Sequence, residues 1–189
     1  LNDGLDAGLQ SEHRQVAVPF ANLLLSEDNA DEVNSTSFSQ ASGTISNIFR
    51  IIELNRGIVA RIDPFVRGHK LLALFGALNK SESDRLNALQ AAEAILRLPS
   101  SQVRVKIGLS AGPLLCGEVG SQLRHEYTVM GEAVNLAARL MSKANSQTVL
   151  FDQALFDHLR ELATATRIEL NLKGVGDKVS VYQFDSWRH

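Results

Sequence analysis

The stretch from Arg124 to Leu140, RHEYTVMGEAVNLAARL, constrains the fold more than any other part of the chain. Its first half, Glu126 to Met130, predicts a short strand, and Gly131 interrupts the apolar pattern directly afterwards. The alanine- and leucine-rich run that begins at Glu132 then predicts a helix. Side chains on this helix are therefore presented by a rigid element that follows its strand without a long loop.

Two polar residues on the predicted helix, Asn135 and Arg139, are four positions apart and therefore lie on one face. Val134, Ala138 and Met141 are expected to form an apolar stripe on another face. An amide can donate and accept hydrogen bonds, and a guanidinium is always charged and planar, so the pair suits a ribose oxygen and a phosphate. The alternative is an ordinary solvated helix face.

The order G-x-x-G-S-x-x-R-x-x-Y-T-V-x-G-x-x-V-N-L-A-A-R, from Gly117 to Arg139, resembles the signature of the class III adenylate and guanylate cyclases. Weaker similarity extends from about Arg14 to about Phe184. The resemblance implies that Asn135 orients the ribose of a nucleoside triphosphate and that Arg139 stabilises the transferring phosphates. It also places Thr128 at the position that helps to read the purine.

The resemblance fails where class III cyclases carry two aspartates that bind Mg²⁺ or Mn²⁺. The first place reads FANLLLS, so Asn22 replaces an aspartate and Leu25 replaces the glycine of a phosphate-cradling turn. The second place reads GHK, so His69 replaces the other aspartate. An amide is a neutral ligand and imidazole prefers softer metals, so we expect no metal site at these positions in this chain alone.

Three other carboxylates, Asp28, Asp31 and Asp63, could substitute as metal ligands, but their spacing matches nothing in the family. Unlike the metal positions, the positions that contact the ribose and the phosphates match the family. Lys173, in an L-K-G sequence, matches the family lysine that contacts the triphosphate. Without the resemblance, Lys173 would be an ordinary turn lysine. The purine-reading lysine of the family would fall at Phe65 and is absent, so ATP and GTP both remain possible substrates.

Hydrophobic periodicity and turn residues predict the other elements of the chain. The first half predicts a strand at Gln15–Leu24 with Pro19 at an edge or bulge, a loop at 26–37, a helix from Phe38 to about Arg56, a hairpin of Ile58–Ile62 and Lys70–Phe75 around Asp63-Pro64, and a helix at Ser81–Leu98. The second half predicts a hairpin of Val103–Ala111 and Leu114–Val119 around Gly112-Pro113, a strand at Thr148–Phe151, a helix capped by Asp152 that reaches about Leu162, and strands at Arg167–Leu172 and Val179–Phe184.

Strands interrupted by helices of this length indicate an α+β fold, with helices packed on one mostly antiparallel sheet. The resemblance implies the ferredoxin-like plan of class III cyclases, although unrelated domains share that general plan. We expect a lead-in at 1–13, one domain at 14–185 and a tail at 186–189. Because the sequence begins at Leu1 rather than at methionine, we also expect it to be part of a longer protein.

Composition excludes several function classes. The chain has 189 residues, 44% of them hydrophobic, and a formal net charge of -2 with scattered charges, so we expect no nucleic-acid partner. The single cysteine, Cys116, cannot form an internal disulfide. No signal peptide or membrane-spanning run is evident, so we expect no membrane contact by this segment and a cytoplasmic location.

The resemblance implies a head-to-tail dimer in which one chain supplies the metal carboxylates and the other supplies Asn, Arg and Lys. This chain matches only the second kind of half, so we expect a cyclase-type domain with little or no activity as a homodimer. One alternative is a working adenylate cyclase, paired with a chain that carries the aspartates or using unrecognised metal ligands. Another is a non-catalytic module for nucleotide binding, dimerisation or regulation.

Overall fold

The computed structural model describes residues 12–25, 35–65, 68–99, 103–121, 124–172 and 178–188. Within these ranges the chain forms twelve elements, in the order β1 (Glu12–Leu25), α1 (Ser35–Leu54), β2 (Gly57–Phe65), β3 (Gly68–Phe75), α2 (Asp84–Leu96), β4 (Val103–Ser121), β5 (Arg124–Met130), α3 (Glu132–Lys143), β6 (Thr148–Phe151), α4 (Gln153–Leu159), β7 (Ala163–Asn171) and β8 (Lys178–Trp187). None of the helices in the described ranges is both long and apolar enough to cross a lipid bilayer.

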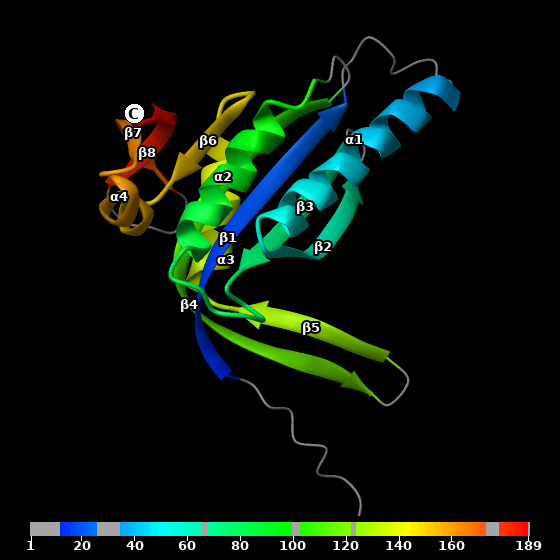
Figure 1. Cartoon of the computed structure of the whole chain (residues 1–189), viewed down its shortest axis with the longest axis horizontal. Helices are drawn as coiled ribbons and strands as arrows, with labels where there is room; N and C mark the ends of the chain where they lie inside the picture. Colours follow the sequence, from blue (N-terminus) through cyan, green and yellow to red (C-terminus); the bar gives the residue numbers. More distant parts are fainter. Residues whose placement is uncertain are drawn as a thin grey trace, which may run out of the picture.

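The strands form one sheet in the order β2-β3-β1-β4-β6-β8-β7, and β5 pairs with the C-terminal part of β4 (Figure 1). β4 and β6 run parallel, whereas the other pairs in the described sheet are antiparallel. The predicted α+β architecture with a mostly antiparallel sheet is therefore confirmed.

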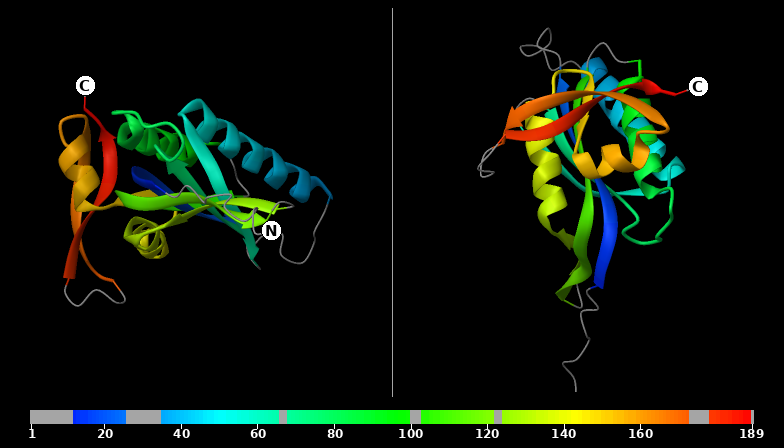
Figure 2. Two further views of the ribbon diagram at one scale, coloured as in Figure 1. Left: turned by 90° about the horizontal axis from the view of Figure 1, so that it is seen from below. Right: turned by 90° about the vertical axis from the view of Figure 1, so that its left-hand side faces the viewer.

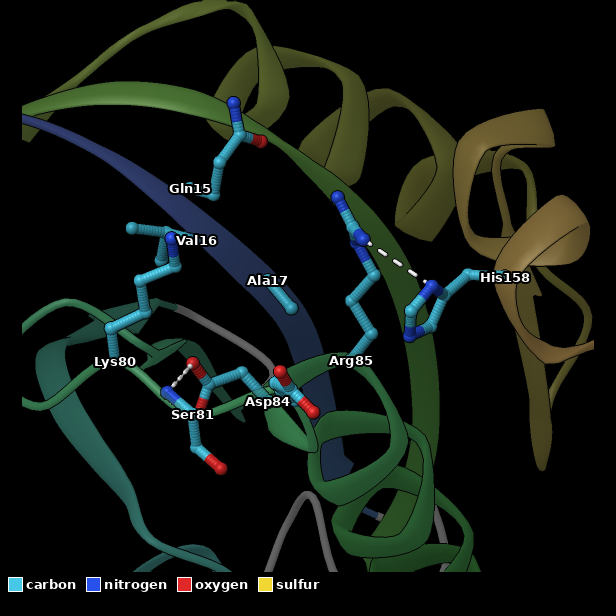
Figure 3. Close-up of a pocket in the computed structure, with 9 residues that line it drawn as sticks. Gln15, Val16, Ala17, Lys80, Ser81, Asp84, Arg85 and His158 are labelled. Atoms are coloured by element: carbon cyan, nitrogen blue, oxygen red, sulfur yellow. Dashed lines mark hydrogen bonds between the residues drawn. The ribbon is translucent and has the colours of Figure 1, made fainter.

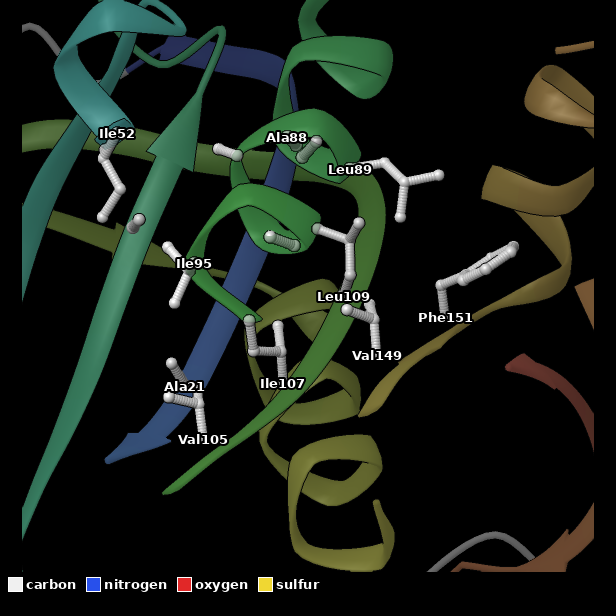
Figure 4. Packing of buried hydrophobic residues seen from close by; sticks show 14 of the residues in the cluster. Ala21, Ile52, Ala88, Leu89, Ile95, Val105, Ile107, Leu109, Val149 and Phe151 are labelled. Carbon is white, nitrogen blue, oxygen red and sulfur yellow. The ribbon is translucent and has the colours of Figure 1, made fainter. Parts of the chain in front are cut away.

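Helices cover both faces of the sheet. α1 and α2 lie on one face and α3 lies on the other, while α4 stands beside β7 and β8 at one end (Figure 2). The larger core cluster joins Ile48 and Ile52 of α1 and Leu89 of α2 to the sheet (Figure 4). A second cluster packs Ala133 and Ala137 of α3 against the opposite face.

The predicted hairpin around Gly112-Pro113 is wrong, because β4 continues through both residues. Gly112 pairs with Val16 and Pro113 pairs with Gln15 of β1. On its other side β4 pairs with β6 only at 106–109 and with β5 only at 115–121. Pro113 falls between these two partners, where its missing N–H breaks no ladder on that side.

The expected positions of two other prolines also need correction. Pro19 was expected at an edge or bulge, but β1 lies between β3 and β4 in the sheet. Its pairing with β4 runs through Pro19, whereas its pairing with β3 passes from Ala17 to Phe20 with the register unchanged. Pro64, expected in a turn, lies within β2, the edge strand, where proline is tolerated.

The helices agree with the periodicity, but their ends differ. Four apolar residues recur at helical spacing in α1 and are buried or half-buried: Ile45, Ile48, Phe49 and Ile52. The helix begins at Ser35, earlier than the predicted Phe38. α2 is shorter than expected, and its N-cap Ser83 makes no side-chain capping bond. Asp152 caps α4 as predicted, by accepting a hydrogen bond from the Leu155 N–H at 2.9 Å, but this helix already ends at Leu159.

The closest approach between helix and sheet lies at Gly108 of β4. A Cβ at this position would overlap the carbonyl oxygen of Ala137 and the amide nitrogen of Met141, which belong to the α3 backbone. Two of the α3 side chains that face the sheet, Ala133 and Ala137, are small and buried, and Ala137 is 0% exposed. The position of α3 above the sheet therefore depends on the absence of a side chain at Gly108.

Gly108→Ala should destabilise the fold by about 2 kcal/mol or more, because the added methyl group meets backbone atoms that cannot rotate away. Gly112→Ala is the matched control on the same strand. Its Cβ would contact only the Ala133 Cβ, at 3.5 Å, and we expect little change. Urea denaturation of both variants measures the difference. Equal, small losses in the two variants would show that α3 is not held by close contact at Gly108.

Candidate functional site

The site predicted from the sequence is centred on α3, which begins immediately after β5. Gly131 connects the two elements, and a Cβ there would come within 2.5 Å of the Leu114 side chain in β4. The chain therefore crosses close over β4 before the helix starts. Glu132 in the first turn and Lys143 in the last turn match the sign of the helix dipole at each end.

The two candidate residues on α3 lie away from its buried face. Asn135 is exposed and Arg139 is half-buried. The buried residues of the helix are Ala133, Ala137, Leu140 and Met141. The predicted apolar stripe is therefore correct at Met141 but wrong by one position at Val134 and Ala138, which are only half-buried. The tight contact at Gly108 turns the alanine side of α3 toward the sheet.

The side chains of Asn135 and Arg139 form no hydrogen bond or ion pair with any other residue that the structure describes. The backbone oxygen of Arg139 accepts a hydrogen bond from the Ser142 hydroxyl at 2.7 Å, which leaves the guanidinium unused by this contact. The amide and the guanidinium can therefore reach a ligand without first breaking an internal contact. This arrangement suits binding of a polar, anionic molecule.

The other two nucleotide-binding candidates are less well defined. The Thr128 backbone lies in β5 opposite Gly117 of β4, in the strand that leads into α3, but its side chain is outside the described residues. Lys173 also lies outside them, in the connection between β7 and β8. Only Asn135 and Arg139 of the four candidates therefore have described side-chain positions.

Asn22, which the resemblance places at the first metal position, has basic neighbours. Asn22 of β1 lies directly opposite Lys70 of β3 on one side and Lys106 of β4 on the other. Directly paired residues share a face of the sheet, so both lysine side chains leave the sheet on the same face as that of Asn22. Its Oδ1 atom is buried and has no hydrogen-bond partner among the described residues. A neutral amide between two cations does not fit a hard divalent cation.

His69, which the resemblance places at the second metal position, lies on the neighbouring strand one residue out of register with Asn22, because its partner in β1 is Leu23. Asp63 is paired with Lys70, two strands from Asn22, and its carboxylate forms an ion pair with Arg61 at 2.8 Å. Asp28 and Asp31 lie outside the described residues. No group of three or more His, Cys, Asp or Glu side chains suited to a metal occurs in the described ranges.

The sequence did not point to Lys70 and Lys106 as members of this region. They are separated by 36 positions, and although Lys70 follows His69 in the GHK sequence, Lys106 lies in no motif. Only the register of the central strands places them on the two sides of Asn22. They could have been found only by predicting that β1 lies between β3 and β4 and how these three strands are aligned.

Comparisons with known proteins agree with the resemblance. The family model for the adenylate and guanylate cyclase catalytic domain matches residues 33–186. Adenylate cyclase type 10 from Oryctolagus cuniculus is 33% identical over 183 residues. This match covers 93% of this chain but only 11% of that protein, so the chain spans about a tenth of the relative's length.

Solved structures share the fold at low identity. The adenylyl cyclase CyaB from P. aeruginosa has a TM-score of 0.80 and 19% identity, with 96% of this chain and 98% of that chain covered. The guanylate cyclase domain of RhGC from Catenaria anguillulae, solved in complex with GTP, has a TM-score of 0.79 and 15% identity, with 94% and 100% covered. The extent of the family match and the identity to a curated cyclase establish that this chain belongs to the class III adenylate and guanylate cyclase catalytic domain family.

Proposed function

We propose that this chain is the half of a cyclase dimer that supplies ribose- and phosphate-binding groups while a partner chain supplies the metal-binding carboxylates. The observation that carries the proposal is the contrast between two regions. Asn135 and Arg139 stand on a rigid helix without competing partners in the described structure, whereas Asn22 is flanked by Lys70 and Lys106. The first arrangement favours phosphate binding, and the second disfavours a divalent cation.

The reaction of the family converts a nucleoside triphosphate into a cyclic nucleotide. The ribose 3′ oxygen attacks the α-phosphorus, a new phosphorus–oxygen bond forms, and pyrophosphate leaves with the electron pair of the broken bond. Negative charge accumulates on the phosphate oxygens during this transfer, so fixed cationic donors accelerate it.

Each retained residue has a role in the proposed composite site. Asn135 holds the ribose oxygens so that the 3′ oxygen faces the α-phosphorus, and Arg139 donates hydrogen bonds to the phosphate oxygens as charge develops. Lys173 contacts the triphosphate and Thr128 contributes to purine recognition. The substrate is ATP or GTP, and a GTP complex of a fold relative shows that this architecture accommodates a nucleotide in that protein.

The metal ions on which the family depends do not fit the donor set that this chain presents. An amide at Asn22 and an imidazole at His69 offer no carboxylate, and two lysines flank the amide. We therefore assign no catalytic step to a metal held by this chain. In the proposed dimer, aspartates of the partner would bind the metal beside the phosphates that Arg139 contacts.

A second candidate function is a non-catalytic nucleotide-binding or regulatory module. It is favoured by the two lysines that are paired with Asn22, because cationic side chains suit phosphate groups. A homodimer in which neither chain carries the metal carboxylates would bind a nucleotide without converting it. The two candidates differ in one respect: only the composite catalytic half gains activity when a partner with aspartates is added.

The purified chain alone should convert ATP or GTP to cyclic product at no more than a trace rate with Mg²⁺ or Mn²⁺. Loss of metal neutralisation removes several kcal/mol of transition-state stabilisation, equivalent to about a thousand-fold in rate or more. Product quantification by mass spectrometry measures the rate. Robust turnover by a homogeneous preparation, abolished by a chelator, would contradict the assignment of Asn22 and His69.

Mixing the chain with a family member that has its aspartates but lacks its own Asn and Arg should produce one complete site per heterodimer. Arg139→Ala should then lower the complemented rate by about 10²- to 10³-fold, because the developing charge loses a fixed guanidinium. Lys143→Ala, at the exposed end of the same helix, is the control and should retain the rate.

Heterodimer formation must be measured in the same samples, by sedimentation velocity. If heterodimers form and show no activity above either parent, the composite site does not exist and the regulatory module is the better description. If Arg139→Ala and Lys143→Ala lower the rate equally, Arg139 has no special role in the transfer.

A further inference from the structure

A pocket of about 350 Å³ lies on the opposite side of the sheet from α3. It is formed by the start of β1, the segment before α2, the first turn of α2, and α4 (Figure 3). Ala17, one of its lining residues, belongs to the core cluster beneath α1 and α2. The pocket is therefore separate from the candidate nucleotide site, and its volume is in the range of small-molecule sites.

The most informative side chain in the pocket is Arg85. It reaches from α2 toward α4, and its Nη1 atom lies 3.4 Å from Nδ1 of His158 (Figure 3). A guanidinium carries five N–H donors in a planar fork, and this single long contact to an imidazole nitrogen uses only one of them. In the described ranges Arg85 forms no ion pair with a carboxylate.

The charge of Arg85 acts on the Asp152 carboxylate, but this carboxylate already has other hydrogen-bond partners. Burial raises the pKa of Asp152, while hydrogen bonds and the charge of Arg85 act in the opposite direction. The Asp152 carboxylate accepts hydrogen bonds from the Ser110 hydroxyl at 2.5 Å and from the Ala111 N–H at 3.1 Å. Asp152 therefore influences Arg85 from a distance and does not occupy its donor fork.

Two acidic residues also line the pocket, and neither blocks the fork. Asp84 is 6% exposed, and its Oδ2 atom accepts a hydrogen bond from the Ser81 N–H at 2.7 Å. This bond holds the Asp84 carboxylate against the turn before α2. Glu82 is exposed to solvent. Lys80 adds a positive charge at the pocket wall, and the amide of Gln15 adds a neutral donor and acceptor (Figure 3).

We propose that this pocket binds a small organic anion through a carboxylate or phosphate group held by Arg85. Carboxylate and phosphate groups each present two oxygens that can accept parallel hydrogen bonds from the guanidinium fork. His158 and Lys80 can add donors from α4 and from the segment before α2. The bound anion bridges α2 and α4, and it therefore stabilises the position of the C-terminal strand pair against the body of the domain.

Isothermal titration calorimetry and thermal unfolding test the proposal with two probes, inorganic phosphate and citrate, against sodium chloride at matched ionic strength. We expect at least one probe to bind and to raise the unfolding temperature by several degrees near saturation, because a ligand selective for the folded state stabilises it. The probe with the higher affinity identifies the preferred group, phosphate or carboxylate.

Arg85→Gln should weaken binding of that probe at least ten-fold, whereas Arg97→Gln, at the exposed far end of α2, should bind like the unaltered chain. If Arg85→Gln does not fold, His158→Ala replaces it, because His158 is exposed and its loss should still weaken binding about three-fold or more. No binding of either probe beyond the chloride control would overturn the proposal. Unchanged affinity in the variant tested would overturn it equally.

Discussion

The backbone contact between α3 and β4 at Gly108 is the constraint on which the candidate site depends. Only a glycine allows the carbonyl oxygen of Ala137 and the amide of Met141 to lie so close to the sheet. The same contact fixes which side of α3 is buried, and it leaves Asn135 and Arg139 on the accessible side. The polar pair thus derives its position from packing beneath the helix, since it makes no described bonds of its own.

In the proposed composite site, charge distinguishes the region of Asn135 and Arg139 from the region of Asn22. Lys70 and Lys106 are paired with Asn22 from both sides, so the position that we propose corresponds to a metal carboxylate of the family has basic register partners here. A single Asn22→Asp change would place a carboxylate opposite two lysines in the strand register. The proposed loss of metal binding therefore involves the register partners of Asn22 as well as Asn22 itself.

The sequence was sufficient for much of the fold because helical periodicity, Gly131 and the cap Asp152 are local signals. It failed at Gly112-Pro113, where a turn signal lies inside the long strand β4, because the gap between β5 and β6 that accommodates Pro113 is a property of the assembled sheet. It also failed to place Lys70 and Lys106 beside Asn22, since strand register is not a local property. Asn135 and Arg139 could be named as candidates because a long continuous motif contains them.

The stoichiometry of nucleotide binding tests the central claim most directly. A non-cyclisable ATP analogue should be titrated with Mn²⁺ into the heterodimer formed with an aspartate-bearing family member, and separately into this chain alone. The account predicts one nucleotide per heterodimer and no Mn²⁺-dependent binding to the chain alone. Two Mn²⁺-dependent nucleotides per homodimer of this chain would contradict it, because each chain would then supply the complete set of ligands.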